Sequence, residues 1–385
     1  MADKIRYVGN AVRKEKNIKN LKRSLSLTLA LLVIIIAALA GLKIAQKTAA
    51  GEETSKAQTG SFPVSFSTND IRDVRVMDKT LVVLTKKFVT ALNSSGKILW
   101  ENPISYGAPA VTVSRNYTVV FDRLSNKYAI IDKNGKMTDR KSDISGQIFN
   151  IRVTDSGRVL LALKSDNSSS LVCLQDKKGE NKLIWSCTQE YVTDLVLSPD
   201  SKTVFCSGIG ASGGELYTKV YALTVKNGHE KSYTLPFASG ININAVSSDK
   251  FNLLTTEGLY FFDSSKDEIA LINSHETKSK LIHWSMDSKG NIAVVTDSTG
   301  DISENTLTVY NSKAEEKYSL SLDDSVEDIF VSEDEALVLY SDSVLSVKKG
   351  EVHRELFFEN KAVGVIKAAR QIYCYSLGGV EKATD

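Results

Sequence analysis

The chain contains few of the residues that most often carry catalysis or bind metals, since only four histidines and four cysteines occur among its 385 residues. The histidines are His229, His275, His283 and His353. None of them forms H-E-x-x-H or another paired spacing typical of metal ligands, so each is expected to be solvated or packed in the core. The sequence predicts no catalytic residue, no metal site and no cofactor.

The cysteines are too few and too scattered for a disulfide framework, and none forms a C-x-x-C pair or a Cys/His spacing typical of zinc. They are Cys173, Cys187, Cys206 and Cys374. Only Cys173 and Cys187 form a plausible pair, because antiparallel pairing of predicted strands at 170–175 and 182–188 places them near each other. Two readings stay open, a disulfide between them or two buried thiols.

One stretch lacks charge altogether, in a chain of which 24% of the residues are charged. Residues 24–42 are nineteen consecutive residues without a charged side chain. As a helix they cover about 28 Å, close to the roughly 30 Å hydrocarbon thickness of a bilayer. The stretch therefore predicts a transmembrane helix that places the protein in a lipid bilayer.

The flanks of this segment predict its orientation. Residues 1–23 hold eight basic and two acidic residues, a formal charge of +6, so the positive-inside bias makes them a basic cytoplasmic tail. Ala38-Leu39-Ala40 would also suit a signal peptidase. However, the basic leader and the apolar run are both longer than a signal peptide usually has, which favours an uncleaved anchor in the cell membrane.

The remainder of the chain is expected outside the cytoplasm. Residues 43–61 are small and polar and predict a linker, and residues 62–385 predict an extracytoplasmic domain. Since the whole chain carries +2 and the tail +6, this remainder carries −4, which excludes a nucleic-acid-binding surface.

From Phe62 onward no stretch of ten or more residues keeps a helical apolar stripe, and the hydrophobic period is two, so the domain is predicted to be all-β. One phrase recurs, an alternating strand, a Ser/Asp/Lys/Gly turn and a very hydrophobic strand. Its copies begin near residues 71, 109, 149, 192, 243, 282, 326 and 362. The spacing is typical of a β-propeller with four-stranded blades. We count eight blades; seven is the alternative if one weak copy is misread.

The spaces between these copies accommodate a third and a fourth strand. Tight hairpins are predicted at Asn93–Gly96, Lys133–Gly135, Lys226–Gly228 and Lys348–Gly350. The last copy ends one strand short of a blade, whereas Phe62–Ser67 is an extra strand ahead of the first. The N-terminal strand is therefore expected to complete the last blade and close the ring.

Two further stretches partly match functional motifs. Gly208–Gly214 matches G-x-G-x-x-G and, from Gly210, G-x-S-x-G, but residues 215–225 alternate like a strand where both motifs need a helix. We expect a flexible inter-strand loop there. Residues 297–304 are acidic but lack the spacing of a calcium loop, which predicts a solvated loop.

Trp100 leads to a resemblance. The stretch Ala91–Trp100, read as ALNSSGKILW, resembles the A-x-D-x-x-T-G-K-x-x-W repeat of quinoprotein-like propellers, with a more distant similarity to WD40-like propellers. The resemblance implies that Trp100 packs between neighbouring blades. Other blades lack this Trp, apart from a fragment at Lys182–Trp185, so quinone binding is not implied. The layout of tail, span, linker and divergent propeller resembles a domain-of-unknown-function family of membrane-anchored propellers from Gram-positive, clostridial-type bacteria.

These observations favour a single-pass membrane protein whose propeller is not an enzyme and binds a protein or a cell-envelope component. Loops at 207–217 and 297–305 are the expected contact regions. The alternative is a propeller enzyme or small-ligand sensor, with Arg, His, Asp or Tyr side chains gathered at the central channel. A third reading has the propeller report its occupancy to the basic tail.

Overall fold

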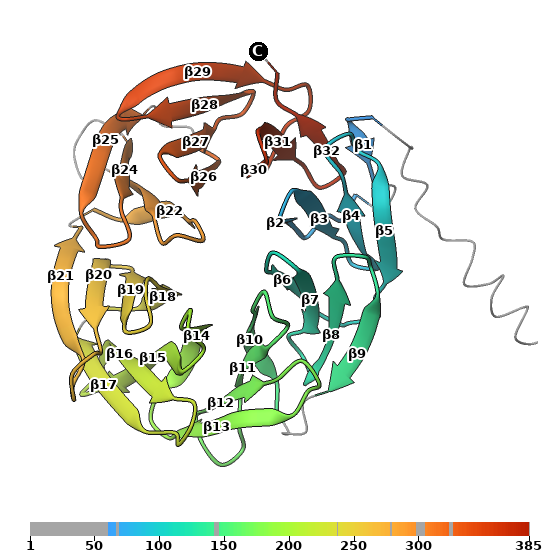
Figure 1. Ribbon diagram of the computed structural model, residues 1–385. Helices are drawn as coiled ribbons and strands as arrows, with labels where there is room; N and C mark the ends of the chain where they lie inside the picture. Colours follow the sequence, from blue (N-terminus) through green and yellow to red (C-terminus); the bar gives the residue numbers. More distant parts are fainter. Residues whose placement is uncertain are drawn as a thin grey trace, which may run out of the picture. The chain divides into compact units, whose positions relative to one another are not determined.

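The computed structural model describes residues 61–66, 69–141, 146–236, 238–277, 279–297, 305–322 and 326–384. Within these ranges the protein is all-β, with eight antiparallel four-stranded sheets arranged as the blades of a ring (Figure 1). The prediction of an eight-bladed propeller is confirmed, and the seven-bladed alternative is wrong.

Each blade takes four strands, from the centre of the ring outward. Blades 1 to 4 contain β2(Asp73–Met77), β3(Thr80–Leu84), β4(Phe88–Leu92), β5(Ile98–Pro103), β6(Pro109–Val113), β7(Tyr117–Asp122), β8(Lys127–Asp132), β9(Met137–Lys141), β10(Ile148–Val153), β11(Val159–Leu163), β12(Ser170–Gln175), β13(Asn181–Cys187), β14(Tyr191–Leu197), β15(Thr203–Ser212), β16(Glu215–Thr224) and β17(Glu230–Pro236). Blades 5 to 8 contain β18(Gly240–Ala245), β19(Lys250–Thr255), β20(Gly258–Asp263), β21(Ala270–Glu276), β22(Leu281–Met286), β23(Ile292–Asp297), β24(Asn305–Tyr310), β25(Glu316–Leu322), β26(Asp328–Ser332), β27(Glu335–Leu339), β28(Ser343–Lys348), β29(Glu351–Phe357), β30(Gly364–Ala368), β31(Gln371–Tyr375), β32(Gly379–Lys382) and β1(Val64–Ser65).

The strands of a blade differ in burial because of their place in the ring. Every residue of β11 and of β27 is buried, since neighbouring blades cover both faces of these second strands. The outermost strand β21 alternates between exposed and half-buried residues, because one of its faces meets solvent. The hydrophobic core therefore lies between blades rather than within one: a single cluster joins Leu160 of blade 3 to Leu195 and Leu223 of blade 4.

The ring is closed by the N-terminal strand, as predicted. Strand β1 pairs antiparallel with β32, with Val64 opposite Val380 and Ser65 opposite Gly379. The side chain of Val64 is fully buried in the cluster shared by the first and last blades. This pairing covers the edge that the last blade would otherwise expose.

The predicted hairpins are confirmed where tight turns require a left-handed backbone. Gly96, Gly135, Gly228 and Gly350 have φ angles of 86°, 84°, 67° and 82°. Glycine adopts this region without the steric cost that a Cβ brings. The inner strands begin within three residues of the predicted copies of the phrase.

The predicted proximity of Cys173 and Cys187 is wrong. Cys173 pairs with Ile184 and Cys187 pairs with Ser170, so the two cysteines lie three residue pairs apart along the β12–β13 ladder and form no disulfide. Strands β12 and β13 do pair as expected, but their register separates the two sulfur atoms. The reading as buried thiols is the correct one.

The predicted tail, span and linker, residues 1–60, lie outside the described residues. In the part of the chain that the structure describes, no helix has both the length and the apolar composition that crossing a membrane requires. The anchor at residues 24–42 stays a prediction.

Candidate functional site

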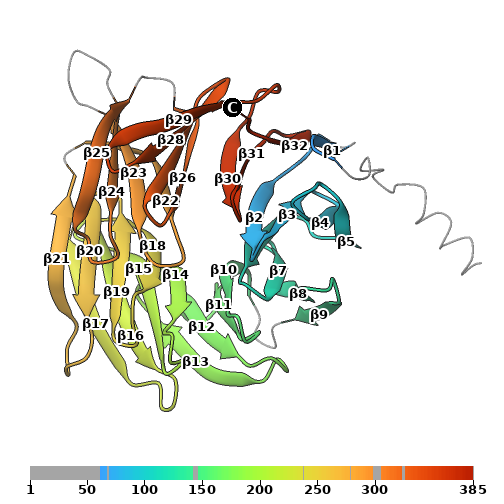
Figure 2. The same ribbon diagram turned by 45° about the horizontal axis from the view of Figure 1, so that its top comes forward.

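The strand order gives the ring two ends. Because the strands of a blade alternate in direction, connections between blades and turns between second and third strands lie at one end, which we call the mouth end (Figures 1 and 2). Turns between first and second strands, and between third and fourth strands, lie at the other end, which we call the turn end. The predicted contact loop at 207–217 lies at the mouth end. Of the one at 297–305, only Asp297 and Asn305, which end β23 and begin β24, are described, and they lie at the same end.

The glycine-rich motif differs from its predicted form. Gly208–Ser212 belong to strand β15, and only Gly213 and Gly214, with φ angles of 61° and 88°, form a turn into strand β16. The strand that follows, rather than a helix, confirms that neither imitated motif is present. A Cβ at Gly208 would lie 2.9 Å from Glu190 Cβ, and one at Gly210 would lie 2.3 Å from Tyr217 Cζ. The glycines thus make room for these two side chains.

Glu190 is the central polar residue of this region. Its carboxylate is buried, with 2% of the residue exposed, in the connection between blades 3 and 4. Tyr217 Oη donates to its Oε1 at 2.9 Å, and Tyr221 Oη and Cys187 Sγ donate to Oε2 at 2.5 Å and 3.2 Å. Sequence reasoning missed this cluster because its members come from three different strands or connections.

Near neutral pH the Glu190 carboxyl is ionised and the hydroxyls of Tyr217 and Tyr221 keep their protons. Burial raises the pKa of the Glu190 carboxyl, but the hydrogen bonds from Tyr221, Cys187 and Tyr217 outweigh it and lower the pKa overall. Burial and the bond to Glu190 raise the pKa of Tyr221, and the bond to Glu190 raises that of Tyr217. A charged carboxylate held by neutral hydroxyls is not poised for acid–base catalysis.

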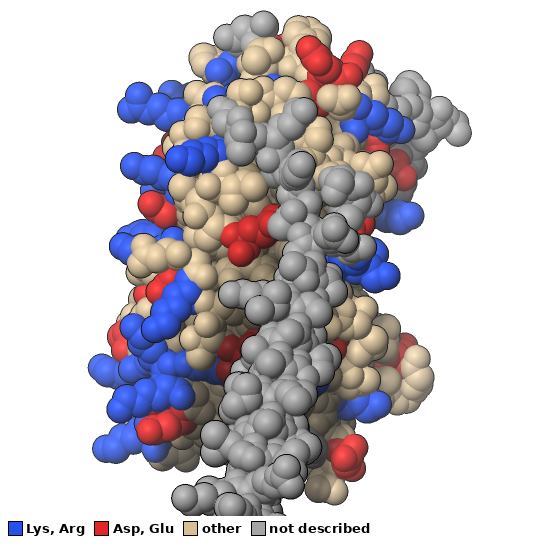
Figure 3. Space-filling view, turned by 90° about the vertical axis from the view of Figure 1, so that its right-hand side faces the viewer, with Lys and Arg blue, Asp and Glu red and all other residues tan. Residues whose placement is uncertain are grey.

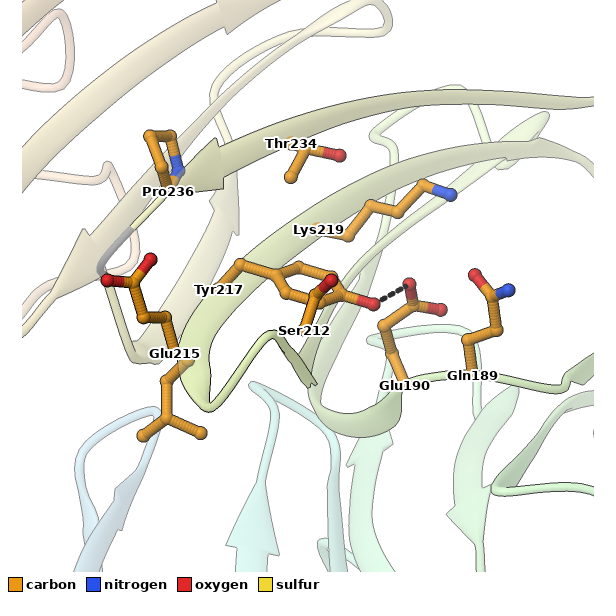
Figure 4. Close-up of a pocket in the computed structure, with 9 residues that line it drawn as sticks. Gln189, Glu190, Ser212, Glu215, Tyr217, Lys219, Thr234 and Pro236 are labelled. Atoms are coloured by element: carbon orange, nitrogen blue, oxygen red, sulfur yellow. Dashed lines mark hydrogen bonds between the residues drawn. The ribbon is translucent and has the colours of Figure 1, made fainter.

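A pocket of about 440 Å³ opens beside Glu190 (Figure 4). Its lining includes Gln189, Ser212, Glu215, Lys219 and Thr234, from the connection before β14 and from strands β15, β16 and β17. Lys219 Nζ lies 5.2 Å from the centre of the Tyr221 ring, a cation–π contact. Both oxygens of Glu190 are already hydrogen-bonded within the fold, so the pocket has a mixed polar wall in which this carboxylate is not free to act as a base.

The mouth end carries exposed apolar side chains around the channel. Phe149, Tyr191, Ile282 and Val363 stand at or beside the starts of inner strands and are 37%, 55%, 40% and 49% exposed. Three more lie in or beside the turns between second and third strands at the same end: Leu124, Leu216 and Leu377. The rings of Phe149 and Tyr191 lie 6.3 Å apart, edge to face. We call these seven residues the apolar rim.

The inner strands also carry charged residues, which the alternative reading requires. The phrase places an aspartate at the same position in three copies, as Asp73, Asp194 and Asp328. Asp194 Oδ2 accepts from Arg152 Nη2 at 2.7 Å and from the backbone N of Ile243 in the next blade at 3.1 Å. Asp328 Oδ2 likewise accepts from Val365 N of the next blade at 3.0 Å. Asp194 and Asp328 join neighbouring blades, whereas Asp73 pairs with Arg75 of its own strand. The recurrence was a sequence signal that could have identified the position.

Arginine, histidine and tyrosine also occur around the channel, near blades 7, 8 and 1. Burial raises the pKa of Asp73, Asp328 and Tyr375. The ring of Tyr375 fills the space beside Gly364, where a Cβ would lie 2.1 Å from Tyr375 Cζ. His283 Nε2 lies 3.1 Å from the carbonyl oxygen of Val326 in the next blade. His283 and Asp328 contact the next blade, whereas Asp73 pairs with Arg75 of its own strand and Tyr375 packs within its own blade. No set of three His, Cys, Asp or Glu among the described residues could hold a metal.

The other histidines follow their predicted roles. His275 packs its ring 4.7 Å from that of Tyr310, and His229 and His353 are exposed. The acidic stretch 297–304 is described only at Asp297, so its predicted loop stays a prediction.

Trp100 packs between blades, as its resemblance implies. Its residue is 9% exposed, and a Cβ at Gly135 of blade 2 would lie 2.4 Å from Trp100 Cβ. Trp185 similarly donates from Nε1 to Glu230 Oε2 of the next blade at 3.0 Å. Both tryptophans stabilise the contact between successive blades.

A family model for a family of unknown function, DUF5711, matches residues 56–378. The chain belongs to this family. No curated protein matches the DUF5711 chain. Among solved structures it is similar to BamB from Moraxella catarrhalis, with 13% identity, a TM-score of 0.51, and 85% of this chain and 99% of BamB covered.

Two other solved propellers are similar to the DUF5711 chain to a comparable degree. A functionally unknown protein from Desulfotomaculum acetoxidans has 12% identity and a TM-score of 0.50 over 80% of this chain and 99% of that one. The propeller domain of Cps50 (Swd1) from Myceliophteria thermophila has 10% identity and a TM-score of 0.50 over 72% and 94%. At these identities the similarity shows the fold alone.

Proposed function

We propose that this DUF5711 propeller is a non-catalytic interaction module, held at the outer face of the cell membrane by residues 24–42, that binds a protein or envelope partner through its mouth end. The observation that carries the proposal is the apolar rim. Seven of the thirteen exposed large apolar side chains in the described residues belong to it. Apolar and aromatic groups gathered on one surface are typical of a protein-binding site.

The polar groups nearby support binding over catalysis. Glu190 has both carboxylate oxygens bonded within the fold, and Asp194 and Asp328 bond backbone amides of the next blade. Polar groups that are already hydrogen-bonded within the fold lose little free energy when a partner protein covers them. These three carboxylates therefore keep their partners when the rim is buried against another protein.

Photo-crosslinking in intact cells tests this proposal with matched positions. A photoreactive residue replaces Tyr191, Leu216 or Leu377 in the rim, and Leu99, Ile272 or Val352 on outermost strands serves as control. The two sets are similarly exposed, at 54–57% and 50–55%. We expect the same discrete crosslinked product from the three rim positions and none from the controls.

Introducing charge into the rim provides a second test of the proposal. Tyr191→Asp together with Ile282→Asp should remove the product from the Leu377 position, because the two carboxylates would have to be desolvated at the interface. Products of equal yield from outer-strand positions, or a product that survives the two aspartates, would rule out the mouth end as the binding surface.

A further inference from the structure

The described chain joins the ring at the turn end, opposite the apolar rim. Ser61 lies beside Gly96 in the turn between β4 and β5, where a Cβ at Gly96 would lie 3.0 Å from the Ser61 carbonyl carbon. Phe62 follows it, with Lys382 Nζ 5.5 Å from its ring centre. The described chain therefore begins at the turn end.

The turn end is unevenly charged. The six turns of blades 1 to 3, residues 78–79, 93–97, 114–116, 133–136, 154–158 and 176–180, hold eight basic and four acidic residues. The turns of blades 4 to 7 hold six basic and eight acidic residues. We call the first group the basic sector. Figure 3 faces the outer strands on the right-hand side of Figure 1 and shows Lys and Arg side chains along one edge of the ring.

Two of the four carboxylates in the basic sector, Asp155 and Asp176, accept hydrogen bonds from turn backbone, and the other two, Asp78 and Glu180, are exposed. Asp176 Oδ1 accepts from the backbone N of Lys178 and of Glu180 at 2.8 Å and 3.0 Å. Asp155 Oδ1 accepts from the backbone N of Arg115 in the preceding blade at 2.7 Å. Lys178 is exposed. Asp155 and Asp176 therefore face turn backbone, and basic residues outnumber the other two acids, Asp78 and Glu180, on this surface.

Elsewhere at the turn end the positive charges are more often paired. Lys289 Nζ lies 2.6 Å from Glu333 Oε1, and Lys202 Nζ lies 3.5 Å from Asp200 Oδ2. The basic sector is thus the part of this end that best suits an anionic surface.

We propose that the basic sector docks on the anionic lipid headgroups of the membrane that holds the predicted anchor, so that the apolar rim faces away from the bilayer. This rests on the anchor part of the proposed function. Residues 43–60 span at most about 60 Å when fully extended and about 23 Å as a flexible coil. A tether of this length holds the turn end near the headgroups, where lysines and arginines are attracted to anionic lipid.

Energy transfer in reconstituted vesicles tests the orientation. The full chain is placed in phosphatidylcholine vesicles with or without phosphatidylglycerol, with an acceptor dye on the lipid. A donor dye is attached at Asn134→Cys in the basic sector or at Glu257→Cys at the mouth end. The native cysteines are buried and do not compete for the dye. We expect transfer from position 134 to exceed transfer from position 257 in phosphatidylglycerol vesicles.

The charge dependence separates docking from mere tethering. Changing Lys79, Lys97, Lys136 and Lys178 to Glu should lower transfer from position 134 roughly twofold or more, to its value in phosphatidylcholine alone. The matched change of Lys226, Lys266, Lys313 and Lys349 to Glu should leave it unchanged. Salt near 1 M, where the Debye length is about 3 Å, should lower transfer from position 134 as the first set of lysine substitutions does.

The outcomes distinguish this inference from the proposal on which it rests. Equal transfer from the two positions, or equal effects of the two lysine sets, overturns docking while the anchor stands. A chain that leaves the vesicles in an alkaline wash overturns the anchor and the docking with it. Transfer that rises only on addition of soluble poly(glycerol phosphate) would assign the sector to a polymer and overturn a lipid surface as the partner.

Discussion

At the scale of single residues, the same aspartate position has different surroundings in different blades. Asp194 lies between Arg152 and the backbone of the next blade, and the coulombic attraction of Asp194 raises the pKa of the Arg152 guanidinium. Asp328 accepts a similar backbone bond but has no salt bridge among the described contacts. Burial is the main influence on Asp328 and raises its pKa above the ordinary 3.8. One sequence position therefore predicts a common backbone role but not a common charge balance.

Replacing each of these aspartates by asparagine should give opposite results. Asp194→Asn leaves the Arg152 guanidinium without its carboxylate and should cost about 2 kcal/mol of unfolding free energy, less than a fully buried pair because Arg152 is partly exposed. Asp328→Asn keeps an acceptor for Val365 N and removes a buried charge, so at pH 7 it should be neutral or stabilising by up to about 1 kcal/mol. Urea unfolding of both variants measures the difference.

The pH dependence of the second variant follows from the raised pKa. A carboxyl whose pKa is higher in the folded state contributes stability below its unfolded pKa, and this contribution is lost as pH rises through the folded pKa. The advantage of Asp328→Asn over the natural protein should therefore be present at pH 7 and vanish near pH 3. An advantage that persists unchanged at pH 3 would show that Asp328 is not held against ionisation by burial.

At the scale of elements, the short strand β1 has a role beyond its length. It supplies the outermost strand of the last blade, and Val64 is fully buried between β32 and the first blade. Its neighbour Ser65 is exposed. Because each core cluster is shared by adjacent blades, loss of this strand exposes the contact between the last and the first blade together.

Val64→Asp should open the closure, because it buries a charge without a partner. We expect a loss of about 3 kcal/mol or more in unfolding free energy and faster hydrogen exchange in β32 and β31. Ser65→Asp, on the opposite face of the same strand, is the matched control and should change stability by less than about 0.5 kcal/mol. If both variants exchange alike, β1 does not close the ring.

At the scale of the whole molecule, the proposed arrangement has an anchor, a charged end and an apolar end. The anchor rests on the composition of residues 24–42 and the basic sector on turns from three blades. The rim rests on residues at the mouth end of five blades. The two ends of the ring lie opposite each other because the strands of a blade alternate in direction.

The anchor should hold the chain in membranes under conditions that release peripheral proteins. We expect the full chain to stay in the pellet after alkaline carbonate extraction, because residues 24–42 satisfy their backbone groups within the bilayer as a helix. Leu32→Arg together with Ile35→Arg should move it to the supernatant, since each arginine costs about 3 kcal/mol at the centre of a span. A mature chain that begins near Gly41 and is released would show instead that the segment is a cleaved signal peptide.

The sequence by itself determined the fold because a propeller is a local pattern repeated. The signals for each blade are local in the sequence: alternating and continuous hydrophobic runs, glycine turns, and a last repeat that is one strand short. The phrase near residue 71 therefore already predicts the first blade. The packing of Trp100 followed from a resemblance of the same local kind.

Only the tertiary structure decided which residues meet. Glu190, Tyr217 and Tyr221 come together through a hairpin that extends past its blade, the register of β12 with β13 separates Cys173 from Cys187, and the rim collects single side chains from distant repeats. Such contacts depend on register and on the angle between blades, which hydrophobic spacing along one chain does not encode.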